Sequence, residues 1–136
     1  MNTRSYAVME ARKPLVPFEF DRRNVGSHDV ALDIAYAGIC HSDIHQAREE
    51  WGPAIFPMVP GHEIAGTVTA IGSSVTKFKV GDKIGVGVFV DSCRTCANCE
   101  QGLQQYCLEG MTGTYNQLTR RKNRRHGWIF QLLCHQ

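Results

Sequence analysis

Four cysteines within fifteen residues constrain this chain more than any other feature of its sequence. They follow the pattern Cys93-x2-Cys96-x2-Cys99-x7-Cys107. Thiolates at two-residue spacing can surround one tetrahedral Zn²⁺, and four protein ligands leave no open coordination position. The energy of metal binding would then help to fold the loop. The pattern predicts a structural zinc site, with an iron–sulfur cluster and buried or disulfide-bonded cysteines as the alternatives.

Length and composition fit one globular domain. The 136 residues are 43% hydrophobic and 21% charged, which allows a single domain with a modest core. No run of about 18 apolar residues could span a membrane, and the N-terminus lacks the apolar run of a secretory signal. We therefore expect a cytoplasmic chain, in which clustered cysteines indicate metal binding rather than disulfides.

The net charge of +2 comes entirely from one end of the sequence. Residues 1–116 hold ten Lys and Arg against thirteen Asp and Glu, a net charge of −3, whereas residues 117–136 hold five basic residues and no acidic ones. Binding of nucleic acid by the whole chain is therefore not expected.

The remaining pattern predicts a mainly β fold. We expect strands at 4–9, 29–38, 64–72 and 84–90. Residues 42–49 suit a short helix, and Pro14 and Pro17 are expected to interrupt the chain after its first strand because proline removes a backbone donor. Short strands at regular spacing, separated by turn residues, favour a small, partly open barrel over a βαβ fold.

A second group of possible metal ligands lies in two separate segments. Cys40 follows one predicted strand and His62 precedes another, so two strand ends could meet at one metal. Asp43 could accept a hydrogen bond from a ligating imidazole, and Ser42 and His45 could pass a proton outward. The residues alone leave this site and its alternative, a buried apolar cysteine and an ordinary histidine, equally open.

Several motifs together resemble the medium-chain, zinc-dependent alcohol dehydrogenases. They are Gly38-Ile39-Cys40-His41-Ser42-Asp43-Ile44-His45, Val59-Pro60-Gly61-His62-Glu63-Ile64-Ala65-Gly66, Val80-Gly81-Asp82-Lys83-Ile84-Gly85-Val86-Gly87 and the four-cysteine loop. The match runs in family order from about Tyr6 to Asn116. It is nearest to the cinnamyl-alcohol-dehydrogenase branch, whose bacterial members are NADP-dependent aldehyde reductases. The resemblance implies a GroES-like partly open barrel, with short helices and a zinc loop, over residues 1–116.

The resemblance also implies a set of metal ligands. Cys40 and His62 correspond to two ligands of the family's catalytic zinc, and Glu63 to a carboxylate beside that metal. Asp43 corresponds to the acceptor behind the histidine. The structural zinc ligands correspond to Cys93, Cys96, Cys99 and Cys107.

Four further residues match positions that serve substrate, proton and cofactor in the family. Ser42 corresponds to the hydroxyl that contacts the substrate oxygen, and His45 to the relay that carries the proton to solvent. His41 lies where the family contacts the cofactor pyrophosphate. Trp51 resembles an aromatic residue that lines the substrate pocket, although a simple hydrophobic anchor is an equal interpretation.

The family's third catalytic ligand and its nucleotide-binding domain have no counterpart in these residues. We therefore expect a truncated N-terminal domain with an incomplete catalytic zinc site, weak binding of NADP(H) and no dehydrogenase activity by itself. Cys134 lies in no family-like context and is expected to be a free thiol. Family members act on small alcohols or aldehydes and are often homodimers.

Residues 117–136 depart from the family and are expected to be a disordered tail that results from a frameshift. Gly127-Trp128-Ile129-Phe130 can be encoded GGG TGG ATA TTC. Read one nucleotide later, this string encodes the family-like Gly-Gly-Tyr-Ser. The alternative is a non-enzymatic zinc-binding module whose basic arm contacts nucleic acid. The nucleotide sequence after residue 136 distinguishes the two.

Overall fold

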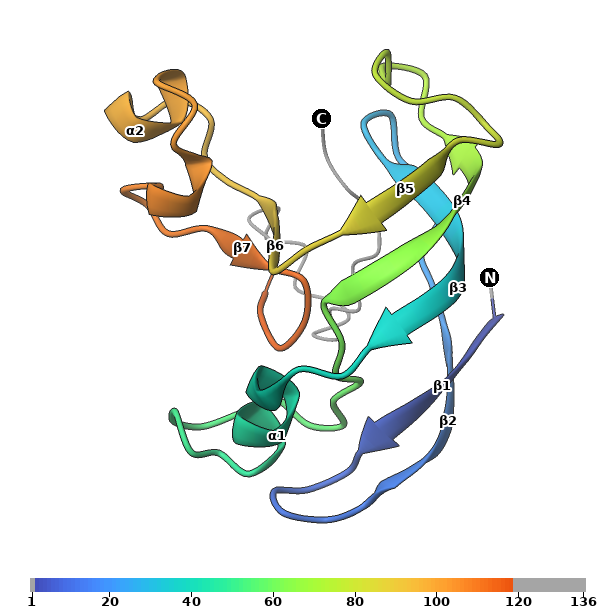
Figure 1. Ribbon diagram of the computed structural model, residues 1–136, viewed down its shortest axis with the longest axis vertical. Helices are drawn as coiled ribbons and strands as arrows, with labels where there is room; N and C mark the ends of the chain where they lie inside the picture. Colours follow the sequence, from blue (N-terminus) through green and yellow to red (C-terminus); the bar gives the residue numbers. More distant parts are fainter. Residues whose placement is uncertain (1, 119–136) are drawn as a thin grey trace.

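The computed structural model describes residues 2–118 and has a mainly β architecture (Figure 1). The strands are β1 (Asn2–Val8), β2 (Leu15–Asp21), β3 (Val30–Gly38), β4 (Glu63–Ile71), β5 (Lys83–Val86), β6 (Phe89–Asp91) and β7 (Thr112–Gly113). The helices are α1 (His41–Ala47), α2 (Ala97–Glu100) and the single 3-10 turn η1 (Gln104–Tyr106). The predicted mainly β fold with short helices is confirmed.

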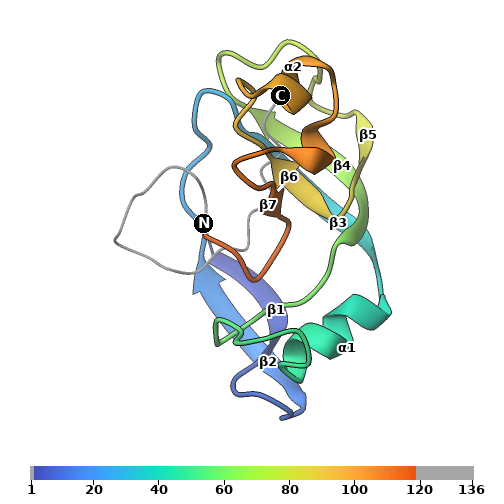
Figure 2. The same cartoon turned by 90° about the vertical axis from the view of Figure 1, so that its left-hand side faces the viewer.

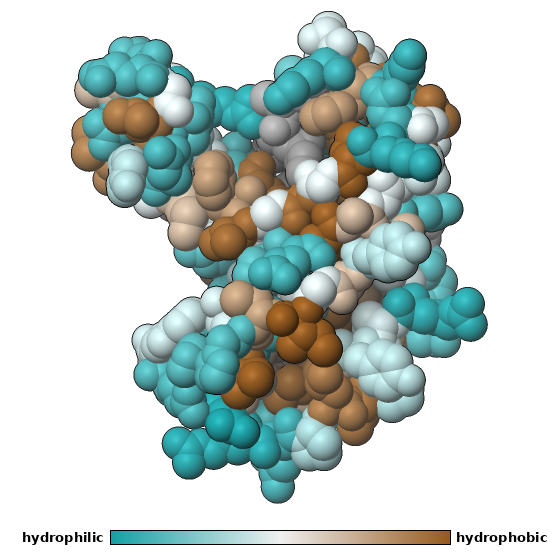
Figure 3. All heavy atoms as spheres, viewed as in Figure 1, coloured by the Kyte–Doolittle hydropathy of each residue, from teal (hydrophilic) through white to brown (hydrophobic). Residues whose placement is uncertain are grey.

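The strands form three small antiparallel sheets rather than one continuous sheet. Their orders are β1-β2, β3-β4-β5 and β6-β7, and within the described residues they do not close into a barrel. Helix α1 lies at one end of the molecule and α2 at the other in both ribbon views (Figures 1 and 2). The part of the chain around α2 and η1 forms a lobe that stands off from the rest of the surface at the upper left of Figure 3.

Two expectations about the strands are wrong in informative ways. Pro14 lies between β1 and β2, as expected, but Pro17 does not interrupt the chain, because it lies within β2 and pairs with Tyr6 of β1. In the described residues β2 pairs only with β1, and an edge strand tolerates a residue without an N–H donor. The strand predicted at 84–90 is two strands, since β5 pairs with β4 whereas β6 pairs with β7. Gly87, which has no side chain, lies where the chain changes partners.

The apolar core follows the central strand β4. One cluster of buried side chains is Val30, Val68 and Val75, and a second is Ile64, Val86 and Val90. Both clusters contain residues of β4, so this strand joins them. The second half of β3 is exposed from Asp33 onward, so its alternating sequence overstates how much of the strand is buried.

A buried carboxylate fastens the segment before β3 to the end of β4. Asp29 is fully buried and accepts hydrogen bonds from the Arg23 side chain and, at 2.6 Å, from the Gly26 amide. The Gly72 amide donates to the Asp29 carbonyl at 2.8 Å. A side chain at Gly72 would collide with the carbonyl oxygens of Gly26 and Ser27, so this close approach requires glycine.

Two predictions concern residues that the structure does not describe. Cys134 and nearly all of the basic tail at 117–136 lie outside residues 2–118. The frameshift and the basic arm therefore stay predictions from sequence. Among residues 2–118, no helix has the length and apolar character needed to cross a membrane.

Candidate metal centres

The four predicted thiol ligands converge in the lobe that carries α2 and η1. Their sulfur atoms all lie within 4.8 Å of one another, and the Sγ atoms of Cys93 and Cys99 are 3.8 Å apart. All four cysteines are free thiols. Zinc held tetrahedrally by thiolates at about 2.3 Å requires sulfurs about 3.8 Å apart, so this spacing fits a single metal ion. In an iron–sulfur cluster the four thiolates are divided among two or more iron atoms, so the sulfurs on different irons would stand farther apart.

Backbone amides of the loop donate hydrogen bonds to the sulfur atoms of Cys93, Cys96 and Cys107. The Cys96 amide lies 3.3 Å from Cys93 Sγ, and the Cys93 amide lies 3.4 Å from Cys107 Sγ. The Leu108 amide lies 3.4 Å from Cys96 Sγ. Amide donors stabilise the thiolate, which is the form of cysteine that binds metals. The amide donors of the loop therefore favour ionised sulfur atoms.

These contacts give the thiols different pKa values. The Leu108 amide lowers the pKa of Cys96 to about 6, and a backbone amide also lowers the pKa of Cys107. The hydrogen bond with Ser92 favours the Cys99 thiolate, yet burial and the neighbouring thiols raise the pKa of Cys99 to about 11. Like charges this close oppose one another, and a divalent cation would allow all four thiols to ionise.

The second cluster forms where β3 ends and β4 begins. Cys40 precedes α1, and His62 immediately precedes β4, whose first residue Glu63 pairs with Gly38 of β3. The ligand atoms of Cys40, His62 and Glu63 all lie within 4.8 Å of one another. The two strand ends therefore meet as the sequence predicts. A thiolate, an imidazole and a carboxylate at this separation fit a zinc site with room for a further ligand.

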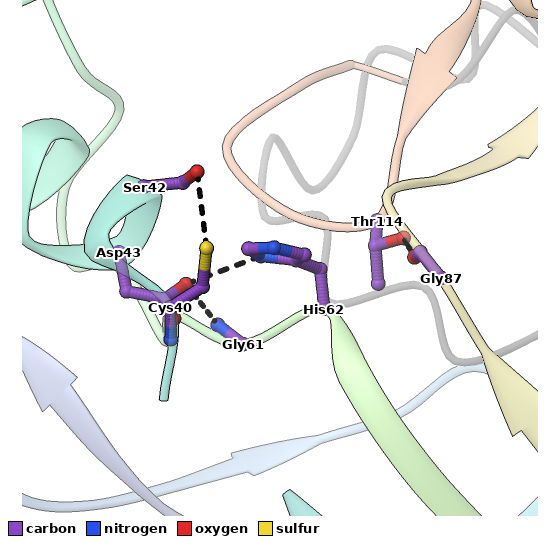
Figure 4. A network of polar contacts seen from close by, with 7 residues as sticks. All are labelled: Cys40, Ser42, Asp43, Gly61, His62, Gly87 and Thr114. Atoms are coloured by element: carbon purple, nitrogen blue, oxygen red, sulfur yellow. Dashed lines mark hydrogen bonds and ion pairs between the residues drawn. The ribbon is translucent and has the colours of Figure 1, made fainter. Parts of the chain in front are cut away.

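Asp43 connects the two segments of this cluster (Figure 4). Its Oδ2 accepts from the Cys40 amide at 3.0 Å, and its Oδ1 accepts from the Gly61 amide at 3.0 Å. The same Oδ1 lies 3.4 Å from His62 Nδ1. Both side chains are more than nine-tenths buried. An Nδ1 hydrogen turned toward Asp43 leaves Nε2 as the free donor of electrons to a metal.

An open pocket lies beside this cluster. Its volume is about 640 Å³, and its walls include Cys40, Ser42, His62, Glu63 and the apolar residues Ile64, Val86 and Val88. The Ser42 hydroxyl lies 3.4 Å from Cys40 Sγ, as Figure 4 shows. The arrangement places one hydroxyl next to the possible metal ligands, on a surface that is otherwise largely apolar.

The structure does not join Ser42 directly to His45. In the described part of the chain, the Ser42 contact goes to Cys40, whereas His45 Nδ1 contacts the Glu50 carboxylate. That hydrogen bond lowers the pKa of Glu50. The His45 ring also contacts two other rings, with ring centroids 4.7 Å from His41 and 4.8 Å from Trp51. His41 and Trp51 are thus neighbours of the expected relay histidine.

Sequence reasoning missed one residue of this centre, Tyr115. Its ring stacks on His62 with centroids 5.8 Å apart and an interplanar angle of 12°. Burial and a hydrogen bond with Asp43 raise the pKa of Tyr115 above its usual value. Because Tyr115 lies more than fifty positions after His62 and carries no metal-binding group, no spacing rule points to it.

The family is shown by a match over most of the chain. Residues 26–129 match the alcohol dehydrogenase GroES-like domain. The chain belongs to this family, and the resemblance found in the sequence is confirmed.

Individual proteins that are similar to this chain carry names that fit this family. The NADP-dependent alcohol dehydrogenase C 1 of Mycolicibacterium smegmatis is 59% identical over 124 residues, which are 90% of this chain and 36% of the relative. A cinnamyl alcohol dehydrogenase of Sorghum bicolor has a similar structure with TM-score 0.88 and 40% identity, covering 100% of this chain and 39% of that one. The structure of CAD from Helicobacter pylori complexed with NADP(H) gives TM-score 0.82 and 46% identity over 86% of this chain and 33% of that one. This chain thus spans between a third and two fifths of the length of these proteins.

Proposed function

We propose that this chain supplies the metal-binding catalytic domain of an oxidoreductase that interconverts alcohols and aldehydes with NADP(H). The observation that carries the proposal is the convergence of Cys40, His62 and Glu63 beside an open pocket, with Asp43 behind the histidine. Relatives whose names specify NADP-dependent alcohol dehydrogenase support the choice of cofactor and reaction. The cofactor, the substrate class, the cytosolic location and a homodimeric state belong to the proposal.

The two clusters would bind zinc for different purposes. The tetrathiolate cluster would hold a structural ion, because four protein ligands leave no position for substrate. Cys40 and His62 would hold a catalytic ion, with Glu63 close enough to exchange with a water ligand. When bound there, zinc supplies a Lewis acid that polarises an alcohol or carbonyl oxygen.

The surrounding residues would handle the proton and the substrates. Ser42 Oγ lines the pocket and would hold the proton of the substrate hydroxyl. The contact of His45 Nδ1 with Glu50 favours the tautomer whose Nε2 can accept a proton. His41 would contact the cofactor phosphates, and the exposed Trp51 would line the substrate entrance.

Metal analysis tests the assignment of the two sites. The 136-residue chain is expected to bind two equivalents of zinc, of which a chelator removes one more readily. Cys40→Ser should abolish the readily removed equivalent, whereas Cys134→Ser should leave both in place. One equivalent in the unaltered chain, or two in Cys40→Ser, would contradict the proposal.

Activity gives a second test. With only two strong candidate ligands in its active-site cluster, the 136-residue chain is predicted not to reduce an aromatic aldehyde with NADPH when assayed alone. The measurement is the loss of NADPH absorbance against a blank that contains zinc without protein. Turnover above this blank would overturn the prediction that this chain is inactive by itself.

A further inference from the structure

The segment Thr114–Asn116 crosses the active-site cluster and is fixed on both sides of it. On one side, the Thr114 amide donates to the Val88 carbonyl at 3.0 Å, and the Thr114 hydroxyl donates to the Gly87 carbonyl (Figure 4). Thr114 is 3% exposed, so these hydrogen bonds are protected from water. They attach the segment to the connection between β5 and β6.

On the other side, Asn116 attaches the segment to α1 and to the loop that follows it. Asn116 Oδ1 accepts from the Ile55 amide at 2.7 Å, and its Nδ2 donates to the Gln46 side chain. Asn116 has a φ of 53°, a left-handed conformation that asparagine adopts more readily than most residues. The residue between these anchors, Tyr115, therefore has little freedom to move.

Tyr115 lies against the face of His62 and close to the carboxylate behind it. Its ring is nearly parallel to the imidazole, and the nearby charge of Asp43 adds to burial in raising the pKa of Tyr115. A carboxylate can accept about four hydrogen bonds. Asp43 faces the Cys40 amide, the Gly61 amide and His62 Nδ1, so its carboxylate has capacity for one further donor such as the Tyr115 hydroxyl.

We propose that Tyr115 is a positioning residue for the Cys40–His62–Glu63 cluster. Its ring holds the His62 imidazole in the plane that directs Nδ1 to Asp43 and leaves Nε2 for a metal. Its hydroxyl holds the Asp43 carboxylate in place. The terminal torsion of histidine is otherwise broad, so the ring could turn and exchange its two edges. The inference rests on the proposed function, because it assumes that this cluster binds zinc.

Two substitutions separate the contributions of the ring and the hydroxyl. Tyr115→Phe keeps the stacking on His62 and removes the hydrogen bond to Asp43, whereas Tyr115→Leu removes both. Tyr36→Phe is the matched control, because it removes a hydroxyl from a tyrosine that is 76% exposed on β3. Cys40→Ser reports whether the more readily chelated zinc occupies this cluster.

Zinc affinity is measured on the 136-residue chain by competition with a chromophoric chelator. Tyr115→Phe should weaken the more readily removed zinc about tenfold, the lower end of the range for outer partners of ligating histidines. Tyr115→Leu should weaken it further, and Tyr36→Phe should leave it unchanged. The tightly held zinc should keep its affinity in all variants, which shows that they remain folded around the four-cysteine loop.

Nitrogen-15 NMR of the His62 ring gives a readout that a general loss of packing would not reproduce. In the unaltered chain we expect one tautomer, with hydrogen on Nδ1, and in Tyr115→Leu a mixture of two. Unaltered affinity and tautomer in Tyr115→Leu would overturn the role of Tyr115. If Cys40→Ser still removes a zinc in that case, the proposed function stands; two equivalents in Cys40→Ser would instead refute the proposed function.

Discussion

The two candidate metal centres are built in opposite ways. The four-cysteine centre takes all its ligands from one segment of fifteen residues, and amides of the same loop donate to its sulfurs. The other centre takes Cys40 from the connection between β3 and α1 and His62 from the position just before β4, and fixes them through Asp43 and Tyr115. The first has a full set of protein ligands, whereas the second opens onto a pocket. A closed set of local ligands suits a structural metal, and an open set assembled from distant segments suits catalysis.

Removal of one ligand from the closed centre should have the largest effect on zinc binding. Cys107→Ser should weaken the tightly held zinc by well over 100-fold, because losing a ligand costs more than the 10–100-fold of outer-sphere changes. The readily chelated zinc should be retained. Metal analysis after dialysis against a chelator measures both. Loss of the two ions together would show that the centres depend on each other.

The thiols of the closed centre should differ strongly in reactivity when the metal is removed. Cys96, with a pKa of about 6, is mostly thiolate at neutral pH, whereas Cys99, with a pKa of about 11, is mostly thiol. Thiolates are the reactive form but lose nucleophilicity as their pKa falls, so Cys96 should be alkylated about 100-fold faster at pH 7. Mass spectrometry of the chain treated with iodoacetamide measures the two rates. The rate at Cys96 should fall as the pH drops through about 6.

Asp43→Ala should damage the open centre and leave the closed one intact. The substitution removes the acceptor for the Cys40 and Gly61 amides as well as the partner of His62. We expect a 10–100-fold loss of affinity for the readily chelated zinc. Because both amides are only partly buried, the loss of each hydrogen bond should also cost about 0.5–1.5 kcal/mol of folding free energy.

The control for Asp43→Ala is Asp33→Ala, at an exposed position of β3. Chelator competition and urea denaturation give the two quantities. Equal effects of the two substitutions on zinc affinity and stability would show that Asp43 does not contribute to the open centre.

The smallest effect on zinc affinity is expected from a substitution at Gly38, which pairs with Glu63 where β3 meets β4. A Cβ at Gly38 would lie 2.9 Å from the Glu63 Cβ, so Gly38→Ala must displace Glu63. Because Glu63 would exchange with a water ligand rather than bind the metal permanently, the affinity for the readily chelated zinc should fall only about threefold, well below the effect of an outer partner of histidine. Gly85→Ala is the matched control, since its Cβ would lie 3.5 Å from the Ile64 carbonyl, an ordinary contact. A loss in both variants would indicate a general disturbance of the sheet.

The sequence by itself determined the features that depend on nearby residues. The cysteine spacing predicts a group of thiols around one metal, because ligands within a few residues of one another can meet whatever surrounds them. The strands β3 and β4 and the helix α1 follow from alternation, β-branched residues and turn signals. Motifs in family order identified the domain, and the match over residues 26–129 agrees.

The tertiary structure decided the features that depend on contacts between distant residues. Pro17 belongs to a strand because β2 has an open edge, and residues 84–90 divide because β5 and β6 have different partners. Tyr115 reaches His62 only because Thr114 and Asn116 are fixed to elements far away in the sequence. Local propensity contains no information about such pairing, since its energy comes from the partner and not from the residue itself.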